Sequence, residues 1–114
     1  MRLKIHGKEH VDTAHAMAKI GTVYERQDKN DVALQNMKGA LVIQLQAHGR
    51  HHVHVAETIG NIAVVHQKQG KMSEALDGQR EALRISKKML GDEHPEVAVS
   101  LNNIAAMHNT RGEH

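Results

Sequence analysis

The sequence predicts an all-α solenoid of antiparallel helix pairs, with about five helices in two and a half repeats. The first observation is a period of 42 residues, which spaces Gly7, Gly49 and Gly91 evenly along the chain. Residues 7–48 match residues 49–90 at 13 of 42 positions. The second observation is that apolar residues recur at helical spacing in two blocks of each unit, with a short polar turn between the blocks. A fixed period of this size is typical of stacked repeats.

The period also sets the expected domain organisation. A single repeat domain is expected over residues 1–114, with its core between neighbouring helices rather than at one centre. The expected parts are the end of a preceding helix at 1–6, repeat 1 at 7–48, repeat 2 at 49–90 and the first half of repeat 3 at 91–114. Both ends of the chain are therefore expected to cut through a repeat of a longer array.

Repeat 1 carries two helical stripes. The first stripe consists of Ala14, Met17, Ile20, Gly21 and Tyr24. The second consists of Val32, Ala33, Met37, Ala40, Leu41 and Ile43. The segment 28–31 between them is acidic at both ends, but it lacks the glycine and the terminal glutamate of a calcium loop, so it is interpreted as a turn.

Repeat 2 has the same organisation, and repeat 3 begins it again. The stripes of repeat 2 are Val55, Ile59, Ile62, Ala63 and His66, and then Met72, Ala75, Leu76, Gln79, Ala82, Leu83 and Ile85. Gly70 suits the left-handed conformation after a helix end, and the short connection makes the two helices antiparallel neighbours. Gly91 is expected to stop the second helix, and Pro95 fits the first turn of the next. That last helix carries Ala98, Leu101, Ile104, Ala105 and His108.

Composition excludes several classes of protein. The chain has no cysteine, which excludes disulfides, a thiol nucleophile and thiolate metal sites. The net charge is only +2, and no basic cluster is interleaved with aromatic residues, so nucleic-acid binding is not expected. No leader and no apolar run long enough for a membrane span is present, which favours a cytoplasmic protein. With no Phe or Trp and a single Tyr, the core is expected to be thin and marginally stable.

The spacing of small and large side chains in repeats 1 and 2 resembles that of a known repeat family. Met17-x-x-Ile20-Gly21-x-x-Tyr24, followed by Ala33 and Ala40, resembles the tetratricopeptide repeat, as does Ile59-x-x-Ile62-Ala63-x-x-His66. The period is longer than the usual length of about 34 residues. The long unit, with residues 90–98 leading into its next helix, is similar to the repeats of kinesin light chains. Similar units occur in nephrocystin-type proteins and in some NTPase-linked receptors.

The resemblance implies a concave groove lined by the first helices of successive repeats. Candidate peptide-binding residues in that groove are Lys19, Arg26, Asn61, Gln67, Lys68, Asn102, Asn103 and Asn109. An amide both donates and accepts hydrogen bonds, so the asparagines could hold the backbone of an extended peptide. The three cations could attract an acidic segment. The alternative is that these residues form a solvated helix face or hydrogen bonds between repeats.

Two further features are a cluster of histidines, which could bind a metal, and glycines inside the expected helices. His48, His51, His52 and His54 cluster in one loop, where a zinc or nickel site is conceivable. We expect no metal, because His10, His52 and His94 recur with the period at helix starts. The histidines could still make stability depend on pH. Gly39, Gly60 and Gly78 lie inside expected helices, where each marks either close helix packing or a place where a ligand can approach.

These patterns favour an interaction module over an enzyme. The chain offers no phosphate loop and no carboxylate pair confined to a cleft, so no catalytic residues, metal or cofactor are expected. The expected function is a scaffold or adaptor that binds a peptide segment of a protein partner in its groove, as a kinesin-light-chain-like cargo adaptor does. One alternative is a structural module that forms homo-oligomers through its exposed repeat ends. Another is the regulatory repeat region of a multidomain NTPase or receptor.

Overall fold

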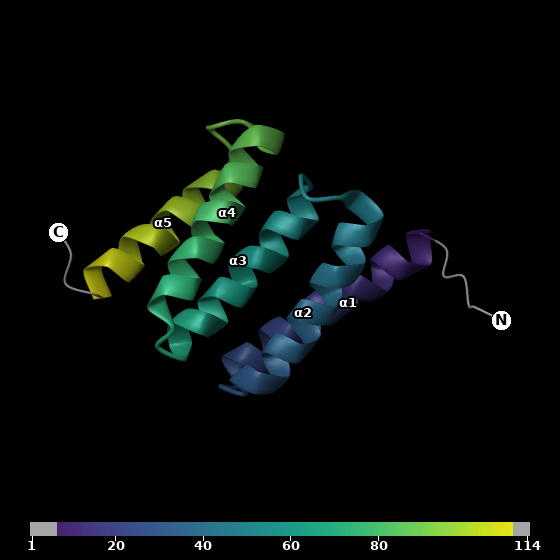
Figure 1. The fold of residues 1–114 in the computed structure, drawn as a ribbon, viewed down its shortest axis with the longest axis horizontal. Coiled ribbons are helices and arrows are strands. Elements are labelled where there is room, and N and C mark those ends of the chain that lie inside the picture. The colour runs from purple at the N-terminus through teal and green to yellow at the C-terminus, as the bar shows by residue number, and fades with distance from the viewer. Residues whose placement is uncertain (1–6, 111–114) are drawn as a thin grey trace.

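A computed structural model of the chain contains an elongated array of five helices, 55 × 33 × 19 Å in extent (Figure 1). It describes the backbone of residues 7–110 and the side chains of residues 12–109. The helices are α1 (Gly7–Arg26), α2 (Asn30–His48), α3 (Val53–Lys68), α4 (Met72–Leu90) and α5 (Pro95–Thr110). The expected helix end at 1–6 and the last residues, 111–114, lie outside the described part of the chain.

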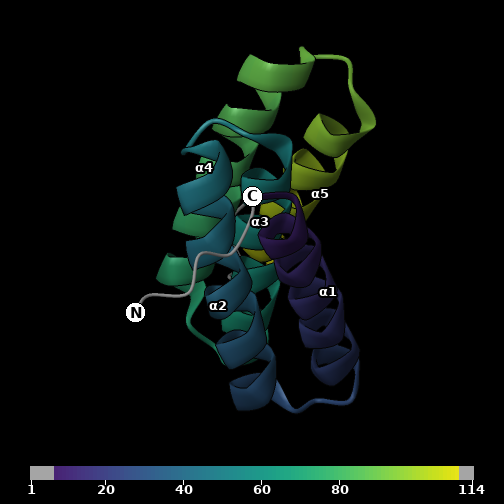
Figure 2. The same cartoon turned by 90° about the vertical axis from the view of Figure 1, so that its right-hand side faces the viewer.

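The helices are arranged in two layers. α1 packs along α2 and α3 along α4 as antiparallel pairs, α2 also contacts α3, and α5 lies along α4. When the molecule is turned by 90°, α2 and α4 lie on one side and α1 and α5 on the other (Figure 2). No strand occurs among residues 7–110. The prediction of an all-α solenoid of antiparallel pairs is therefore confirmed.

The turns use the residues that the period repeats. Gly49, Gly70 and Gly91 adopt φ values of 82°, 81° and 89°, in the left-handed region that glycine tolerates best. Asp28 stands 42 residues before Gly70 and adopts the same conformation, with φ 63°. Its short polar side chain makes the left-handed region tolerable there. Pro95 is the first residue of α5, as expected from its missing N–H.

The core consists of four small clusters, each lying between two or three neighbouring helices. Met37 packs with Ile62 and Val65 between α2 and α3, while Ile85 packs with Val55 between α3 and α4. The other two clusters centre on alanines of α1 and α2 and on Met107 with residues of α4. Ala33 and Ala75, which the sequence places at the helix contacts, are both 0% exposed. Small apolar residues therefore bring the helices together, and no single centre exists in the described chain.

Glycines lie at close contacts within both helix pairs, and a Cβ added to Gly39 of α2 would lie 2.7 Å from Met17 Cε of α1. In the α1–α2 pair, a Cβ added to Gly21 would lie 2.7 Å from Met37 Cγ and 3.1 Å from the Ala33 carbonyl oxygen. The equivalent position in α3 holds Ala63, and the glycine there is Gly78 of α4. A Cβ on Gly78 would lie 3.0 Å from Ala63 Cβ. For Gly78, close helix packing is therefore the explanation.

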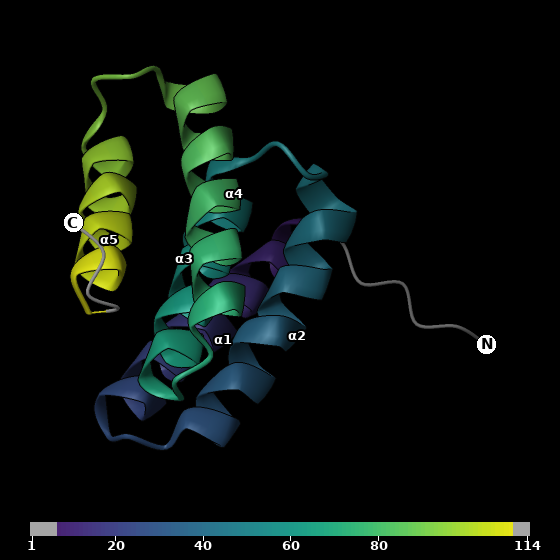
Figure 3. The same cartoon turned by 60° about the vertical axis from the view of Figure 1, so that its left-hand side comes forward.

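The two end helices each leave one side uncovered. Ile20 and Val23 of α1 are 46% and 52% exposed, whereas the equivalent Ile62 and Val65 of α3 are 9% and 0% exposed because α2 covers them. At the other end, Ala98 and Ala105 of α5 are exposed. Figure 3 shows α5 at the edge of the array, with α4 on one side only.

The helices of the array are too polar for a lipid bilayer. None of the described helices combines the length and the apolar character that a membrane span requires.

Candidate functional site

A hollow lies between α3 and α5, with α4 as its floor. We call it the α3–α5 hollow, and its volume is about 280 Å³. Its lining residues are Ala56, Glu57, Gly60, Asn61, Val64, Gln79, Ala82, Ser86, Glu96, Val99, Ser100 and Asn103.

A second hollow lies at the equivalent place one repeat earlier. This α1–α3 hollow has a volume of about 130 Å³ and α2 as its floor. Its lining residues are His15, Ala18, Lys19, Thr22, Gln44, Glu57, Thr58 and Asn61. Glu57 and Asn61 of α3 line both hollows. The two hollows therefore adjoin across α3 and form one groove on the side of α1, α3 and α5.

The hollows differ in volume, and one pair of residues at the floor changes size between them. In the α1–α3 hollow, Thr58 Oγ1 donates a hydrogen bond of 2.6 Å to Gln44 Oε1, and both residues are at most 2% exposed. The equivalent residues of the α3–α5 hollow are Ser100 and Ser86, each 42 residues further on. Serine is smaller than threonine or glutamine, so this exchange leaves more space above α4.

Gly60 gives the α3–α5 hollow an open wall. Its carbonyl oxygen accepts a hydrogen bond of 3.0 Å from Gln79 Nε2 of α4. A Cβ added to Gly60 would lie 3.7 Å from Gln79 Oε1 and 3.8 Å from Ala82 Cβ, which are ordinary contact distances. Unlike Gly78, Gly60 is therefore not required by helix packing. It lines a space that a ligand can enter.

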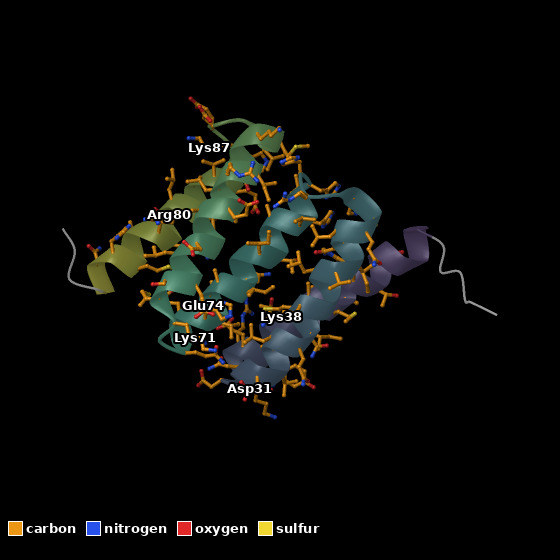
Figure 4. All side chains as sticks on the ribbon, viewed as in Figure 1. Asp31, Lys38, Lys71, Glu74, Arg80 and Lys87 are labelled. Carbon is orange, nitrogen blue, oxygen red and sulfur yellow. The ribbon has the colours of Figure 1, made fainter. Side chains whose placement is uncertain are left out.

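The opposite face of the array is charged with both signs. Figure 4 labels side chains from the α2–α4 side of the array. All six are exposed: Asp31, Lys38, Lys71, Glu74, Arg80 and Lys87. Acidic and basic groups are mixed there, which is typical of a solvated face.

Three of the eight residues predicted for the groove line the hollows. They are Lys19 in the α1–α3 hollow, Asn103 in the α3–α5 hollow and Asn61 in both. The other five line neither hollow: Arg26, Gln67, Lys68, Asn102 and Asn109.

Lys68 pairs with Glu25 at the end of α1. Its ammonium group forms an ion pair with the Glu25 carboxylate and donates a hydrogen bond of 2.9 Å to the Glu25 carbonyl oxygen. Asp28 Oδ1 lies 3.5 Å away. The hydrogen bond to Glu25, supported by both negative charges, raises the pKa of Lys68. Lys68 therefore connects α3 to α1 instead of offering a free cation to a partner.

Sequence reasoning missed the polar residues at the floor and far wall of the groove. These are Gln44, Thr58, Gln79, Ser86, Glu96 and Ser100. These residues could have been identified from the sequence because they are polar residues at positions of otherwise apolar helical stripes. Pairs such as Gln44 and Ser86, or Thr58 and Ser100, keep polar atoms at the same buried position of successive repeats.

The clustered histidines stack on one another. The rings of His48 and His52 lie 3.7 Å apart and nearly parallel, and His54 meets His15 edge to face at 5.2 Å. Side chains 12–109 contain no group of three or more metal-ligating residues placed to hold one ion. His52 instead caps α3, because its Nδ1 accepts a hydrogen bond of 3.1 Å from the His54 backbone N–H.

The cap recurs one repeat later but not one repeat earlier. His94 Nδ1 accepts a hydrogen bond of 3.1 Å from the Glu96 backbone N–H at the start of α5. His10, by contrast, follows the first residue of α1 by three positions, so it does not stand at the helix start as expected. Burial, with His48 and His54 nearby, holds the pKa of His52 below its ordinary value.

The His52 cap makes acid sensitivity an expected result. A protonated Nδ1 cannot accept a hydrogen bond, so the folded chain keeps His52 neutral while the unfolded chain takes up a proton first. Stability should therefore fall as pH drops from 7.5 to 5.5. The loss of one helix cap corresponds to about 1 kcal/mol, or about 4 °C in Tm. Thermal unfolding followed by circular dichroism at the two pH values measures it.

The matched substitutions identify the group responsible. His52→Asn keeps an N-cap acceptor that does not titrate, so it should reduce the pH dependence. His51→Asn, at an exposed neighbour, should leave it unchanged. Equal Tm values at pH 5.5 and 7.5 for the parent chain would contradict the expectation.

Comparison with known proteins places this architecture in a family. The sequence model named Tetratricopeptide repeat matches residues 12–88 and residues 54–114. No curated protein matches the sequence. The crystal structure of BtubC (BKLC) from P. vanneervenii is similar in fold, with a TM-score of 0.80 at 21% sequence identity, over 86% of this chain and 39% of that chain. This chain thus spans about two-fifths of the length of that structure.

Proposed function

Because this chain belongs to the tetratricopeptide repeat family, we propose that it is a protein-interaction module that holds an extended segment of a partner in the groove of α1, α3 and α5. Repeats of this family generally mediate protein–protein interaction. The observation that carries the proposal is that two hollows at equivalent positions adjoin across α3 and share Glu57 and Asn61. A continuous groove of this kind suits a chain segment better than a small molecule.

Asparagine side chains give the groove a way to hold a peptide backbone. Asn61 stands between the two hollows and Asn103 lines the far one. Each amide can donate to a peptide carbonyl and accept from a peptide N–H at once. Asn61 and Asn103 are also spaced by one repeat, so an extended segment that crosses α3 and α5 would meet the same group twice.

A peptide-display library of random octapeptides tests the proposal. Selected peptides should bind the parent chain, and Asn61→Ala or Asn103→Ala should weaken binding about tenfold, the effect of losing about 1.4 kcal/mol. Asn102→Ala is the matched control, since Asn102 is exposed and lines neither hollow. Isothermal titration calorimetry provides the affinities. Binding that is unchanged in both groove variants would place the interaction elsewhere and refute the proposal.

The uncovered end helices favour a second candidate, a homo-oligomer formed through the ends of the array. α1 exposes Ile20 and Val23, and α5 exposes Leu101. Inside the array, however, the equivalent sides of α3 pack on second helices, namely α2 and α4. α1 and α5, the outermost helices that the structure describes, are both first helices of their repeats, so contact between them requires a packing unlike the one within the array. Light scattering that gives a monomer mass at all concentrations would refute this candidate.

Two narrower roles follow from the repeat length alone. A kinesin-light-chain-like cargo adaptor remains our preferred version of the interaction module, because the 42-residue unit resembles that subtype. A regulatory repeat region of an NTPase or receptor is the other version. The likeness to BtubC (BKLC) supports the fold that both versions share.

A further inference from the structure

The α3–α5 hollow is acidic: its described lining holds two carboxylates and no cationic side chain, and His54 Nδ1, outside that lining, lies 3.8 Å from Glu57 Oε1. Glu57 of α3 and Glu96 of α5 both line it. Among the described residues that line this hollow, none is Lys, Arg or His. The α1–α3 hollow differs, because Lys19 there lies alongside Glu57. The negative charge is therefore concentrated in one half of the groove.

The carboxylates stand at positions that face each other across the groove. The equivalent positions one repeat earlier hold His15 and His54, whose rings make contact at 5.2 Å. Two carboxylates that line one hollow from α3 and α5 favour a cation placed between them. The repeat does not require this pair, since its other copy is a histidine contact. The pair therefore points to something that binds in the hollow.

Two buried hydroxyls in the same hollow support this independently. Ser86 and Ser100 are 3% and 6% exposed, and both line the hollow. The described chain provides neither hydroxyl with a hydrogen-bond partner, whereas the equivalent Gln44 and Thr58 bond to each other. Neither oxygen is among the described buried atoms that lack a partner, so both reach the open space of the hollow. Unpaired hydroxyls that line a hollow are thus available to a ligand.

Every polar side chain that lines the hollow can accept a hydrogen bond from an occupant. Carboxylates only accept, hydroxyls have free lone pairs, and the amides of Asn61 and Asn103 each carry a carbonyl oxygen. A lysine ammonium group carries three donors and no acceptor, and an arginine guanidinium group carries five. A cationic side chain therefore matches the hollow in both charge and hydrogen bonding.

We propose that the α3–α5 hollow takes a lysine or arginine side chain of the bound peptide, with Glu57 and Glu96 as its counter-ions and Ser86 and Ser100 beneath it. This inference rests on the proposed function and adds the chemistry of the ligand. It differs from the expectation of an acidic segment. That expectation counted Lys68, which is paired with Glu25, and only Lys19 of the expected cations lines a hollow.

The octapeptide library provides the first test. Peptides selected on the parent chain at pH 7.5 should be enriched in Lys or Arg at one position. Glu57→Gln and Glu96→Gln should each weaken binding of the leading basic peptide about tenfold, as expected for loss of a charge-assisted hydrogen bond. Added salt should weaken the parent and leave the double variant less affected. Glu74→Gln is the matched control, because it removes the same charge from the opposite, exposed face.

Gly60→Ala provides a test in which loss of binding cannot be explained by loss of stability. The added methyl meets only ordinary contacts and replaces glycine inside a helix, so Tm should rise. The same methyl stands in the wall of the hollow, so affinity for the basic peptide should fall about tenfold, to be measured by calorimetry. A variant that is more stable but binds less tightly locates the ligand in the hollow. Unchanged affinity in Gly60→Ala would contradict the inference.

The outcomes separate this inference from the proposed function. If selected peptides depend on Asn103 but show no basic residue, or bind Glu57→Gln and Glu96→Gln as tightly as the parent, the cation is refuted and the groove remains. If no peptide is selected, or none depends on Asn61 or Asn103, the groove itself is refuted together with the cation.

Discussion

Replacing Ile85 with alanine is expected to lower the free energy of unfolding by about 2–5 kcal/mol. Ile85 is 0% exposed and packs with Val55, Ala56 and Ala82 between α3 and α4. Three of its neighbours are alanine or valine, which cannot extend into the space that the lost side chain leaves. Since a domain of this size has a total stability of about 5–15 kcal/mol, the variant should be unfolded to a measurable extent near physiological temperature.

Ile43 is the matched control for this substitution, since it stands at the same position one repeat earlier. It is half-buried against Ala14, Ala18 and Ala40, so part of its side chain already contacts water. Ile43→Ala should therefore lose about half as much free energy as Ile85→Ala. Urea unfolding followed by circular dichroism measures both. Equal losses would show that packing at the two positions does not differ as the structure indicates.

The second large effect is expected at the buried hydrogen bond between α2 and α3. Thr58→Val keeps the shape of the side chain but removes the donor, so Gln44 Oε1 is left buried without its partner. Such a group costs about 1–3 kcal/mol of stability. The expected result is a lower urea midpoint with an unchanged dependence on denaturant, because the unfolded surface stays the same.

A double substitution separates the hydrogen bond from packing. Adding Gln44→Leu removes the unpaired acceptor, so the double variant should recover most of the lost stability. Ser100→Ala, at the position equivalent to Thr58, should have little effect, because no hydrogen bond from its hydroxyl is present in the described chain. A double variant as unstable as Thr58→Val alone would mean that shape, rather than the hydrogen bond, causes the loss.

The fold could be predicted from sequence because its determinants are local and repeated. Ala33 and Ala75 are both fully buried where helices meet, and the glycines at the three turns have the left-handed backbone that their positions suggested. Each feature depends on spacing within one repeat, which the sequence shows more than once. The number of helices and their pairing follow from the same spacing, because short connections leave consecutive helices few ways to pack.

The site was predicted only in part, because it depends on how neighbouring repeats pack against each other. Asn102 and Asn103 are neighbours on α5, yet only Asn103 lines the α3–α5 hollow. The choice between them depends on the rotation of α5 about its axis, which its contact with α4 sets. Lys68 pairs with Glu25 in the preceding repeat, a contact that no single repeat contains.

The uneven cover of the helices also determines which of them opens last. α2, α3 and α4 each pack against helices on both sides, with α3 in the middle of the array, whereas α1 and α5 each have a free side. In stacked repeats, local opening depends on nearest neighbours, so amide hydrogens of α3 should exchange with deuterated solvent most slowly. A peptide lying across the groove would touch this persistent helix and two that open more readily. Its main signature in such an experiment should therefore be slower exchange in α1 and α5.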